Sequence, residues 1–289
     1  ISMIIYFVKI HVGPELAKKI VPTQKPFHSF LHNLISDSLF FTPTNEQEIL
    51  NIIKNLKKKN SSGFDNISNN LLTNIAPEIT KPLEHIFNLS LCTGIVPANM
   101  KIAKVIPILK KGDSSVFSNY RPISLLTSFS KILEKIIYVR TVTFLSKQNI
   151  FSETQIGFRE KHTTTHAVLY FMEKIASAID NHCHSAGIFL DFSKAFDTID
   201  HNILLHKLYH YGIRGKALEW FRSYLSDRQQ YVLLNDCKST TKPILCGVPQ
   251  GSLLGPLLFL CYINDISHSS HALTLFADDS SVIYTHKDP

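Results

Sequence analysis

Apolar side chains recur at helical spacing in several stretches of the chain. Thr44 to Gln47 reads T-N-E-Q, a capping-box pattern that predicts the start of a helix. We expect this helix to run through Lys59, because four apolar residues share one of its faces, and to end at the Ser61–Asp65 break. These residues are Ile49, Ile52, Ile53 and Leu56. Residues 1–43, which precede it, form a poorly defined N-terminal segment.

Three further segments of the first 180 residues are predicted to be helices. One runs from about Pro82 to Cys92 and is ended by Gly94. A long helix begins at about Ser130, and another spans residues 164–180. Each of the last two carries an apolar stripe of the kind that faces a core. The stripes consist of Ile132, Leu133, Ile136, Ile137, Phe144 and Leu145 in the first, and of Val168, Phe171, Met172, Ile175 and Ile179 in the second.

Short apolar runs bounded by turn residues predict strands. Ile102–Leu109 reads as an edge strand, because Pro107 cannot donate a ladder hydrogen bond, and Lys110–Asp113 turns the chain. Residues 231–234 and 243–245 are expected to pair as a hairpin. The other predicted strands are Ala186–Leu190, ending on Asp191, and Leu273–Ala277 with Ser281–Tyr284, joined by Asp278 and Asp279 in an acidic turn.

The second half of the chain mixes these strands with helices. Helices are predicted near 202–211, closed by Gly212, and near 215–225. Gly247–Gly255 is a Gly/Pro loop that leads into an apolar helix. Because strands and helices do not alternate strictly, we expect an α+β fold rather than a doubly wound sheet.

Charge is distributed unevenly along the 289 residues. The net charge is +7, but residues 1–150 carry 18 basic and 9 acidic side chains, and residues 151–289 carry 12 and 14. A basic first half suggests a polyanionic partner, and the slightly acidic second half suggests bound cations.

Composition excludes several classes of protein. The five cysteines are odd in number and form no C-x-x-C pair, so we expect neither a disulfide framework nor a cysteine zinc site, and an intracellular, reducing location. Apolar runs fall short of the ~18 residues of a membrane span. The opening Met3–Val8 run is interrupted by Lys9 and lacks the basic n-region and the small-residue cleavage site of a signal peptide. We therefore expect no membrane partner.

Aspartates are the first candidates for chemistry. Adjacent carboxylates at Asp278 and Asp279 repel each other, and a divalent cation would relieve this, although Asp is also a good turn residue. Asp191 ends a strand, which is a rigid platform for a ligand, but it could equally cap the next helix. For Asp197 and Asp200 we favour helix capping.

Glycine-rich and basic segments are the second candidates. Gly247–Ser252 has two glycines around Pro-Gln, which lets the backbone approach a ligand, although an ordinary loop before a core helix also fits. Lys110, Lys111 and Arg121 could clamp phosphates or could lie in a solvated turn. His162 and His166 are four residues apart, but the adjacent threonines suggest a helix start instead of a metal pair, and we assign no histidine to a metal.

Six of these segments, taken in order, resemble the reverse transcriptase domain of non-LTR (LINE-type) retrotransposons, nearest to the jockey-like group. They are IPILKKGD (106–113), NYRPISLL (119–126), QIGFR (155–159), LDFSKAFD (190–197), GVPQGS (247–252) and FADD (276–279). The resemblance covers about residues 100–285, and the segment 44–99 is similar to the helical N-terminal extension of the family. Any one segment is a weak signal, whereas six in the order of the family are specific.

The resemblance implies an α+β, right-hand polymerase fold with fingers and palm over residues 100–289, acting as an RNA-directed DNA polymerase. Its implied partners are an RNA template, a DNA primer and deoxynucleoside triphosphates, with two Mg²⁺ ions for which Mn²⁺ could substitute. The implied catalytic residues are Asp191, Asp278 and Asp279. The implied metal-binding positions are these three and Phe192. The implied nucleotide-binding positions are Lys110, Arg121, Phe196, Gln250 and Gly251, with Phe196 placed against a ribose 2′-hydroxyl.

The ends of the chain and the family suggest further expectations. The chain begins with Ile1 and stops at Pro289, so we expect a fragment that lacks the thumb and the primer grip of the family. The family alone implies action in the nucleus. One alternative is a truncated, non-catalytic remnant that only binds nucleic acid, which the basic first half would favour. Another is an RNA-templated RNA polymerase, against which Phe196 argues because a bulky ring should clash with a 2′-hydroxyl.

Overall fold

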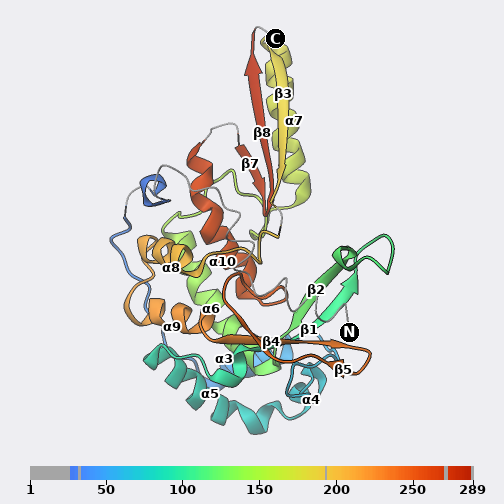
Figure 1. The fold of residues 1–289 in the computed structure, drawn as a ribbon. Coiled ribbons are helices and arrows are strands. Elements are labelled where there is room, and N and C mark those ends of the chain that lie inside the picture. The colour runs from blue at the N-terminus through green and yellow to red at the C-terminus, as the bar shows by residue number, and fades with distance from the viewer. Residues whose placement is uncertain (1–26, 32–33, 193, 270–272, 288–289) are drawn as a thin grey trace.

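The computed structural model describes residues 27–31, 34–192, 194–269 and 273–287. Figure 1 shows a helical body, with one sheet at its side, and an arm that projects from it. Most of the N-terminal segment predicted to be poorly defined, including Met3–Val8, lies outside the described residues. Within the part that is described, no helix is both long and apolar enough to cross a membrane.

The body contains most of the helices. Their bounds are α3 (Glu46–Lys54), α4 (Asn69–Asn74), α5 (Ala76–Thr93), α6 (Ser128–Lys147), α8 (His201–His210), α9 (Gly215–Leu225) and α10 (Leu254–Ile263). Short 3₁₀ turns add η1 (Phe27–Phe30), η2 (Ala98–Lys101), η3 (Phe117–Asn119) and η4 (Asn264–Ser269).

The sheet of the body has the order β2-β1-β4-β5, with β6 also paired to β4. Its strands are β1 (Ile102–Leu109), β2 (Tyr120–Leu125), β4 (Arg228–Leu234), β5 (Cys237–Lys238) and β6 (Lys242–Ile244). The prediction that β1 is an edge strand is wrong, because β1 lies between β2 and β4. Its parallel ladder with β4 nevertheless stops at Val105, so Pro107 is paired only with Pro122 of β2 and has no β4 residue to which it would need to donate.

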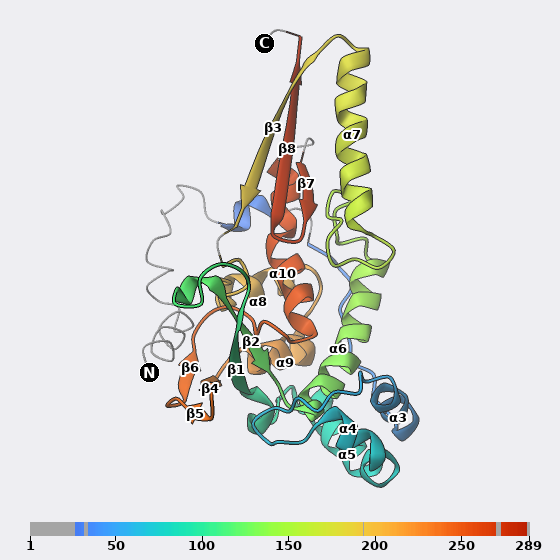
Figure 2. The same ribbon diagram turned by 90° about the vertical axis from the view of Figure 1, so that its right-hand side faces the viewer.

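The arm consists of α7 (Thr164–Asp180) and a three-stranded antiparallel sheet of order β3-β8-β7. The strands are β3 (His184–Asp191), β7 (Leu273–Phe276) and β8 (Asp279–His286). Figure 2 shows α7 above α6 on one side of the molecule, with the long β3–β8 ladder beside it. This mixture of helices and strands confirms the prediction of a mixed fold.

A single apolar core fills the body. Residues of α5, α6, α8, α9 and α10 belong to one buried cluster. Trp220 is fully buried there, stacks on Tyr224 at 5.4 Å between ring centroids, and donates its indole N–H to the Ser90 hydroxyl at 3.0 Å. This hydrogen bond satisfies the one polar atom of the indole, so the ring can be buried at little polar cost.

Several helix boundaries differ from the prediction. α3 is capped by Asn45, whose side chain accepts the Glu48 N–H at 2.8 Å, so the capping box predicted from Thr44 is wrong by one residue. The helix ends at Lys54 instead of Lys59. α5 begins at Ala76, because Pro77 occupies its first turn and Pro82 is accommodated inside the helix.

Other predicted elements are confirmed within a few residues. α6 begins after the Thr127 cap, two residues before the predicted start, and α7 spans the predicted residues. β4 and β6 do pair as an antiparallel ladder, although through residues 228–230 and 242–244. The apolar stripe of α7 is the main surprise, because Val168, Met172 and Ile179 are 55–65% exposed.

Candidate functional site

The ladder between β3 and β8 brings two of the predicted aspartates together. Asp191 is the last residue of β3 and is the direct register partner of Asp279, the first residue of β8. Directly opposed residues of an antiparallel pair lie on the same face with Cα atoms roughly 5 Å apart. Both lie at the body end of the arm, where β3 ends and β8 begins (Figure 1).

Asp278 lies in the turn between β7 and β8. The turn consists of Ala277 and Asp278, with Phe276 paired to Asp279 across it. Ala277 has a φ of 60°, as a tight two-residue hairpin turn requires. The prediction that both carboxylates occupy the turn is therefore wrong for Asp279, which begins the strand.

The segment Gln155–Gly157 holds this hairpin in place, a role that sequence reasoning missed. The Ile156 N–H donates to the Leu275 carbonyl at 2.8 Å, and the buried Gln155 Oε1 accepts the Ala277 N–H at 3.2 Å. Gly157 lies so close that a Cβ there would be 2.1 Å from the Ala277 nitrogen. The signal in the sequence was the lone glycine after Gln155 and Ile156, because such a close contact leaves no room for a larger residue.

The donor set at the hairpin suits a hard divalent cation. Mg²⁺ prefers carboxylate oxygens and is usually held by one or two carboxylates together with substrate phosphates and water. Asp191 and Asp279 supply two such groups on one face. Within the described ranges, no three His, Cys, Asp or Glu side chains are close enough to form a complete metal cage. The residues therefore fit a site that substrate oxygens complete, and the meeting of all three aspartates with Phe192 in one site stays a prediction.

A pocket of about 420 Å³ adjoins the two paired aspartates. α7 contributes one wall and the β3-β8-β7 sheet the other. Apart from Asp191 and Asp279, its lining is mainly apolar and includes Val168, Phe171 and Phe276. The carboxylates thus border an open, weakly polar space, in which a bound cation would be less well solvated than in bulk water.

The loop Gly247–Ser252 lies beside the body sheet. The Gln250 carbonyl accepts the N–H of Ser124 from β2 at 2.8 Å, and a Cβ on Gly251 would meet the Ser124 carbonyl at 2.7 Å. At the end of the loop, the buried carboxylate of Glu134 on α6 accepts the Leu253 N–H at 2.7 Å. Burial raises the pKa of Glu134, although hydrogen bonds and the charge of Arg228 oppose this.

Phe196 is held between two other rings. It stacks on Phe259 of α10, with centroids 4.8 Å apart, and meets the edge of Phe158 at 6.0 Å. Phe158 belongs to the QIGFR segment and is 50% exposed. Neighbouring rings restrict the rotamers of Phe196, which suits a residue whose bulk excludes a ligand group.

The predicted basic residues lie on the β1–β2 hairpin. Arg121 is exposed on β2 and is paired with Ile108, and Lys110 and Lys111 are exposed in the turn that follows β1. The Lys110 N–H donates to the Asn119 carbonyl at 2.8 Å, which closes this turn. These cations are therefore accessible to a polyanion.

Two predicted capping roles are resolved. Asp200 is the N-cap of α8, and its Oδ1 accepts the Asn202 and Ile203 N–H groups. Asp197 contacts the side chain of Gln250 instead, so the prediction that it caps a helix is wrong. His166 accepts the Thr163 N–H at 3.0 Å in the first turn of α7, which confirms the helix start predicted there.

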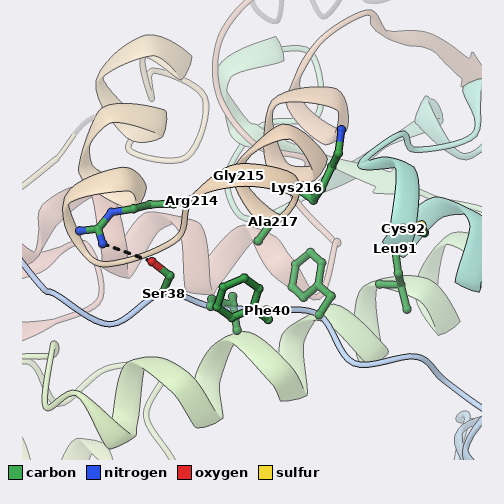
Figure 3. Close-up of a pocket in the computed structure, with 10 residues that line it drawn as sticks. Ser38, Phe40, Leu91, Cys92, Arg214, Gly215, Lys216 and Ala217 are labelled. Atoms are coloured by element: carbon green, nitrogen blue, oxygen red, sulfur yellow. Dashed lines mark hydrogen bonds between the residues drawn. The ribbon is translucent and has the colours of Figure 1, made fainter.

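Another pocket, of about 430 Å³, is drawn in Figure 3, and its described lining includes none of the three candidate aspartates. It is bordered by residues 38–41, the end of α5 and the start of α9. Arg214 donates to the Ser38 hydroxyl at 3.3 Å, shown as a dashed line, and to the carbonyl groups of Ile35 and Ser36. Among the described residues that line this pocket there is no carboxylate. The contacts of Arg214 fasten residues 35–38 to the start of α9.

Comparison with known proteins identifies the family of this fold and site. Residues 108–289 match the family described as reverse transcriptase (RNA-dependent DNA polymerase). The chain belongs to this family. The match includes Arg121, Asp191, the 247–252 loop and the 278–279 pair, which confirms the resemblance found in the sequence.

Its relatives are polymerases of mobile elements. The chain is 32% identical over 264 residues to the probable RNA-directed DNA polymerase from transposon BS of Drosophila melanogaster, covering 86% of the chain. It is 30% identical over 264 residues to that from the mobile element jockey, and 31% over 261 residues to the probable polymerase from transposon X-element, each covering 88% of the chain and both from the same species. The chain spans only 28–29% of the length of these three relatives.

Proposed function

We propose that this chain carries the active site of an RNA-directed DNA polymerase of a non-LTR retrotransposon. The observation that carries the proposal is the register pairing of Asp191 with Asp279 at the junction of arm and body, beside Asp278 in the turn. Two carboxylates on one face, with a third next to them, suit the transfer of a nucleotide to a primer 3′-hydroxyl.

The residues of the site have distinct proposed roles. Asp191, Asp278 and Asp279, with the Phe192 backbone, would hold two Mg²⁺ ions, for which Mn²⁺ could substitute. When bound, such ions lower the pKa of the attacking hydroxyl and neutralise the pyrophosphate that leaves. Lys110 and Arg121, both exposed, would bind the triphosphate through charge-assisted hydrogen bonds.

Other residues would orient the nucleotide and select its sugar. Gln250 and Gly251 would lie against the incoming nucleotide. The loop that carries them is hydrogen-bonded to Ser124 on β2, the strand that also carries Arg121. Phe196 would exclude a 2′-hydroxyl, since Phe158 and Phe259 limit the movement of its ring. The proposed substrates are an RNA template, a DNA primer and deoxynucleoside triphosphates.

Primer extension tests the proposal directly. The chain is supplied with an RNA template, a DNA primer, one deoxynucleotide and Mg²⁺, and product is compared with that of Asp191→Asn and Asp278→Asn. We expect Mg²⁺-dependent product from the unsubstituted chain and a loss of about 10³-fold or more in either variant, because metal-ion electrostatics supply several kcal/mol of the barrier reduction. Asp180→Asn is the matched control, because Asp180 is exposed at the end of α7 and should leave the rate unchanged.

A non-catalytic nucleic-acid-binding remnant is the second candidate, favoured by the net charge of +9 on residues 1–150. RNA binding that survives the loss of all three aspartates, without extension by any form of the chain, would support this candidate and contradict the first. An RNA-templated RNA polymerase is distinguished by Phe196→Ala. This substitution should allow a DNA polymerase to accept ribonucleotides, whereas it would leave the sugar selectivity of an RNA polymerase unchanged.

A further inference from the structure

The loop that carries Gln250 is joined to the segment Phe196–His201 along its length. The Val248 N–H donates to the Phe196 carbonyl and the Gly247 N–H to the Ile199 carbonyl, both at 2.8 Å. The Cys246 thiol contacts the Asp197 carbonyl at 3.2 Å. Two stretches about 50 residues apart in the sequence therefore form one rigid unit.

Gly247 and His201 hold one end of this unit. Gly247 has a φ of +79°, and a Cβ there would lie 2.7 Å from the Asp197 carbonyl oxygen, so only glycine allows such close contact. The Nε2 atom of His201 lies 2.7 Å from the Gly247 carbonyl oxygen and donates to it. The position of Gln250 relative to Asp197 is thus set by backbone contacts on both sides.

Asp197 contacts the Gln250 side chain within this unit. The Gln250 Nε2 lies 2.9 Å from one carboxylate oxygen of Asp197 and 3.1 Å from the other. An ionised carboxylate can only accept hydrogen bonds, so the amide nitrogen must face Asp197. The side-chain carbonyl oxygen of Gln250, Oε1, is then directed away from Asp197. There it can accept a hydrogen bond from a hydroxyl or amino group of a ligand.

We propose that Asp197 is a positioning residue, whose carboxylate fixes the side-chain amide of Gln250 in the one orientation that binds the incoming nucleotide. This inference rests on the proposed polymerase function and adds a residue to it. Phe196, which precedes Asp197, belongs to the same unit, so the sugar-selecting ring and the Gln250 amide are set in register with each other.

Steady-state kinetics of single-nucleotide addition test the inference. Asn at position 197 can donate as well as accept, so Asp197→Asn no longer selects one orientation of the Gln250 amide. We expect the KM for the nucleotide to rise about tenfold, as for the loss of one charge-assisted hydrogen bond, with kcat changed far less. Asp200→Asn is the matched control: asparagine is an equally good N-cap for α8, so both parameters should stay unchanged.

A double-substitution cycle separates positioning from general stabilisation. If Asp197 acts only through Gln250, then Asp197→Asn should add nothing to the KM of Gln250→Met, whereas an independent structural role would multiply the two effects. Two results would overturn this inference and leave the proposed function intact. One is that the two substitutions multiply their effects on KM, and the other is an unchanged KM in Asp197→Asn while the unsubstituted chain is active. No nucleotide addition by the unsubstituted chain would count against both.

Nuclear magnetic resonance gives a readout that needs no activity. The side-chain amide signals of Gln250 are assigned by their disappearance in Gln250→Met. We expect them to be shifted from the random-coil position in the unsubstituted chain and in Asp200→Asn, and to move toward it in Asp197→Asn. Identical signals in Asp197→Asn would show that the carboxylate does not hold the amide.

Discussion

The body and the arm bury their side chains to very different degrees, although the sequence patterns of their helices look alike. α6 in the body buries nine residues, among them Ile132, Leu133 and Ile136. α7 in the arm buries only Ala178 among its described side chains. β3 is exposed along all eight of its residues, despite an unbroken ladder with β8.

This difference shows what holds each region together. The body is stabilised by apolar burial around a large core, whereas the described arm buries only a few apolar side chains of β7 and β8, such as Leu275, and otherwise depends on the backbone hydrogen bonds of its ladders. Asp191, Asp278 and Asp279 lie at the junction of the two regions. Their geometry therefore depends on the residues that join arm to body, chiefly Gln155–Gly157.

Gly157→Ala should have the largest effect, because it acts on this junction. The new Cβ would overlap the backbone of Ala277, and either that turn or the QIGFR segment must move. We expect nucleotide addition to fall below detection and the free energy of unfolding to drop by about 3 kcal/mol, as for severe overpacking. Extension and urea unfolding are the measurements.

The matched control for this change is Gly187→Ala in β3. A Cβ there would have its nearest contact, a Phe171 ring carbon, at 3.4 Å, so alanine should be tolerated. If Gly157→Ala keeps full activity, or if Gly187→Ala loses as much, the junction does not have the importance assigned to it.

A pair of leucine substitutions compares the two regions themselves. Leu133 on α6 is 2% exposed, and Leu169 on α7 is 60% exposed. Leu133→Ala should lower the free energy of unfolding by about 3 kcal/mol, and Leu169→Ala should change it by less than about 0.5 kcal/mol. Fluorescence of Trp220, the single tryptophan, reports unfolding of the body in urea. Equal losses for the two variants would mean that α7 is covered in solution.

The smallest expected effect is a loss of stability at acidic pH that arises from His201. Burial lowers the pKa of His201 below its ordinary value of 6.5, and its bond to the Gly247 carbonyl and the charge of Asp200 offset only part of this. The unfolded chain then takes up a proton at this residue that the folded chain does not, so the contribution of His201 to stability is constant above pH 6.5 and falls as the pH drops below it.

His201→Gln removes this titration and keeps a donor that can reach the Gly247 carbonyl. The free energy of unfolding is measured at pH 7.5 and at pH 5.5, each about 1 unit from the pKa of a free histidine. The difference between the two values should be smaller for His201→Gln than for the unsubstituted chain. The other histidines contribute equally to both proteins. An equal acid-induced loss in the two would show that His201 does not titrate as described.

The sequence predicted the elements of both regions but not their burial. The apolar stripes of α6 and α7 follow the same spacing rule, and the rule says which face is apolar, not what covers it. Helix starts were missed where competing caps lay side by side, as at Thr44 and Asn45. The start of α5 was predicted at Pro82 and not at Ala76, because a proline is rarer inside a helix than at its start.

The candidate site was predictable as residue types, and its supports were not. Asp191 and Asp278 could be singled out by their positions after strands, and family motifs supplied Phe196 and Gln250. The contact between Asp197 and Gln250 joins positions 53 apart in the chain, and no local pattern distinguishes this aspartate from the capping Asp200. Long-range pairing of this kind depends on the tertiary fold.

Metal-directed cleavage can locate the proposed metal site on the polypeptide. Fe²⁺ replaces Mg²⁺ in the chain bound to primer, template and nucleotide, and ascorbate with peroxide generates radicals that cut the backbone near the ion. We expect cuts beside residue 191 and beside residues 277–280, both lost in Asp191→Asn and both present in Asp180→Asn. Cuts elsewhere, or cuts that persist in Asp191→Asn, would contradict a metal site at the junction of arm and body.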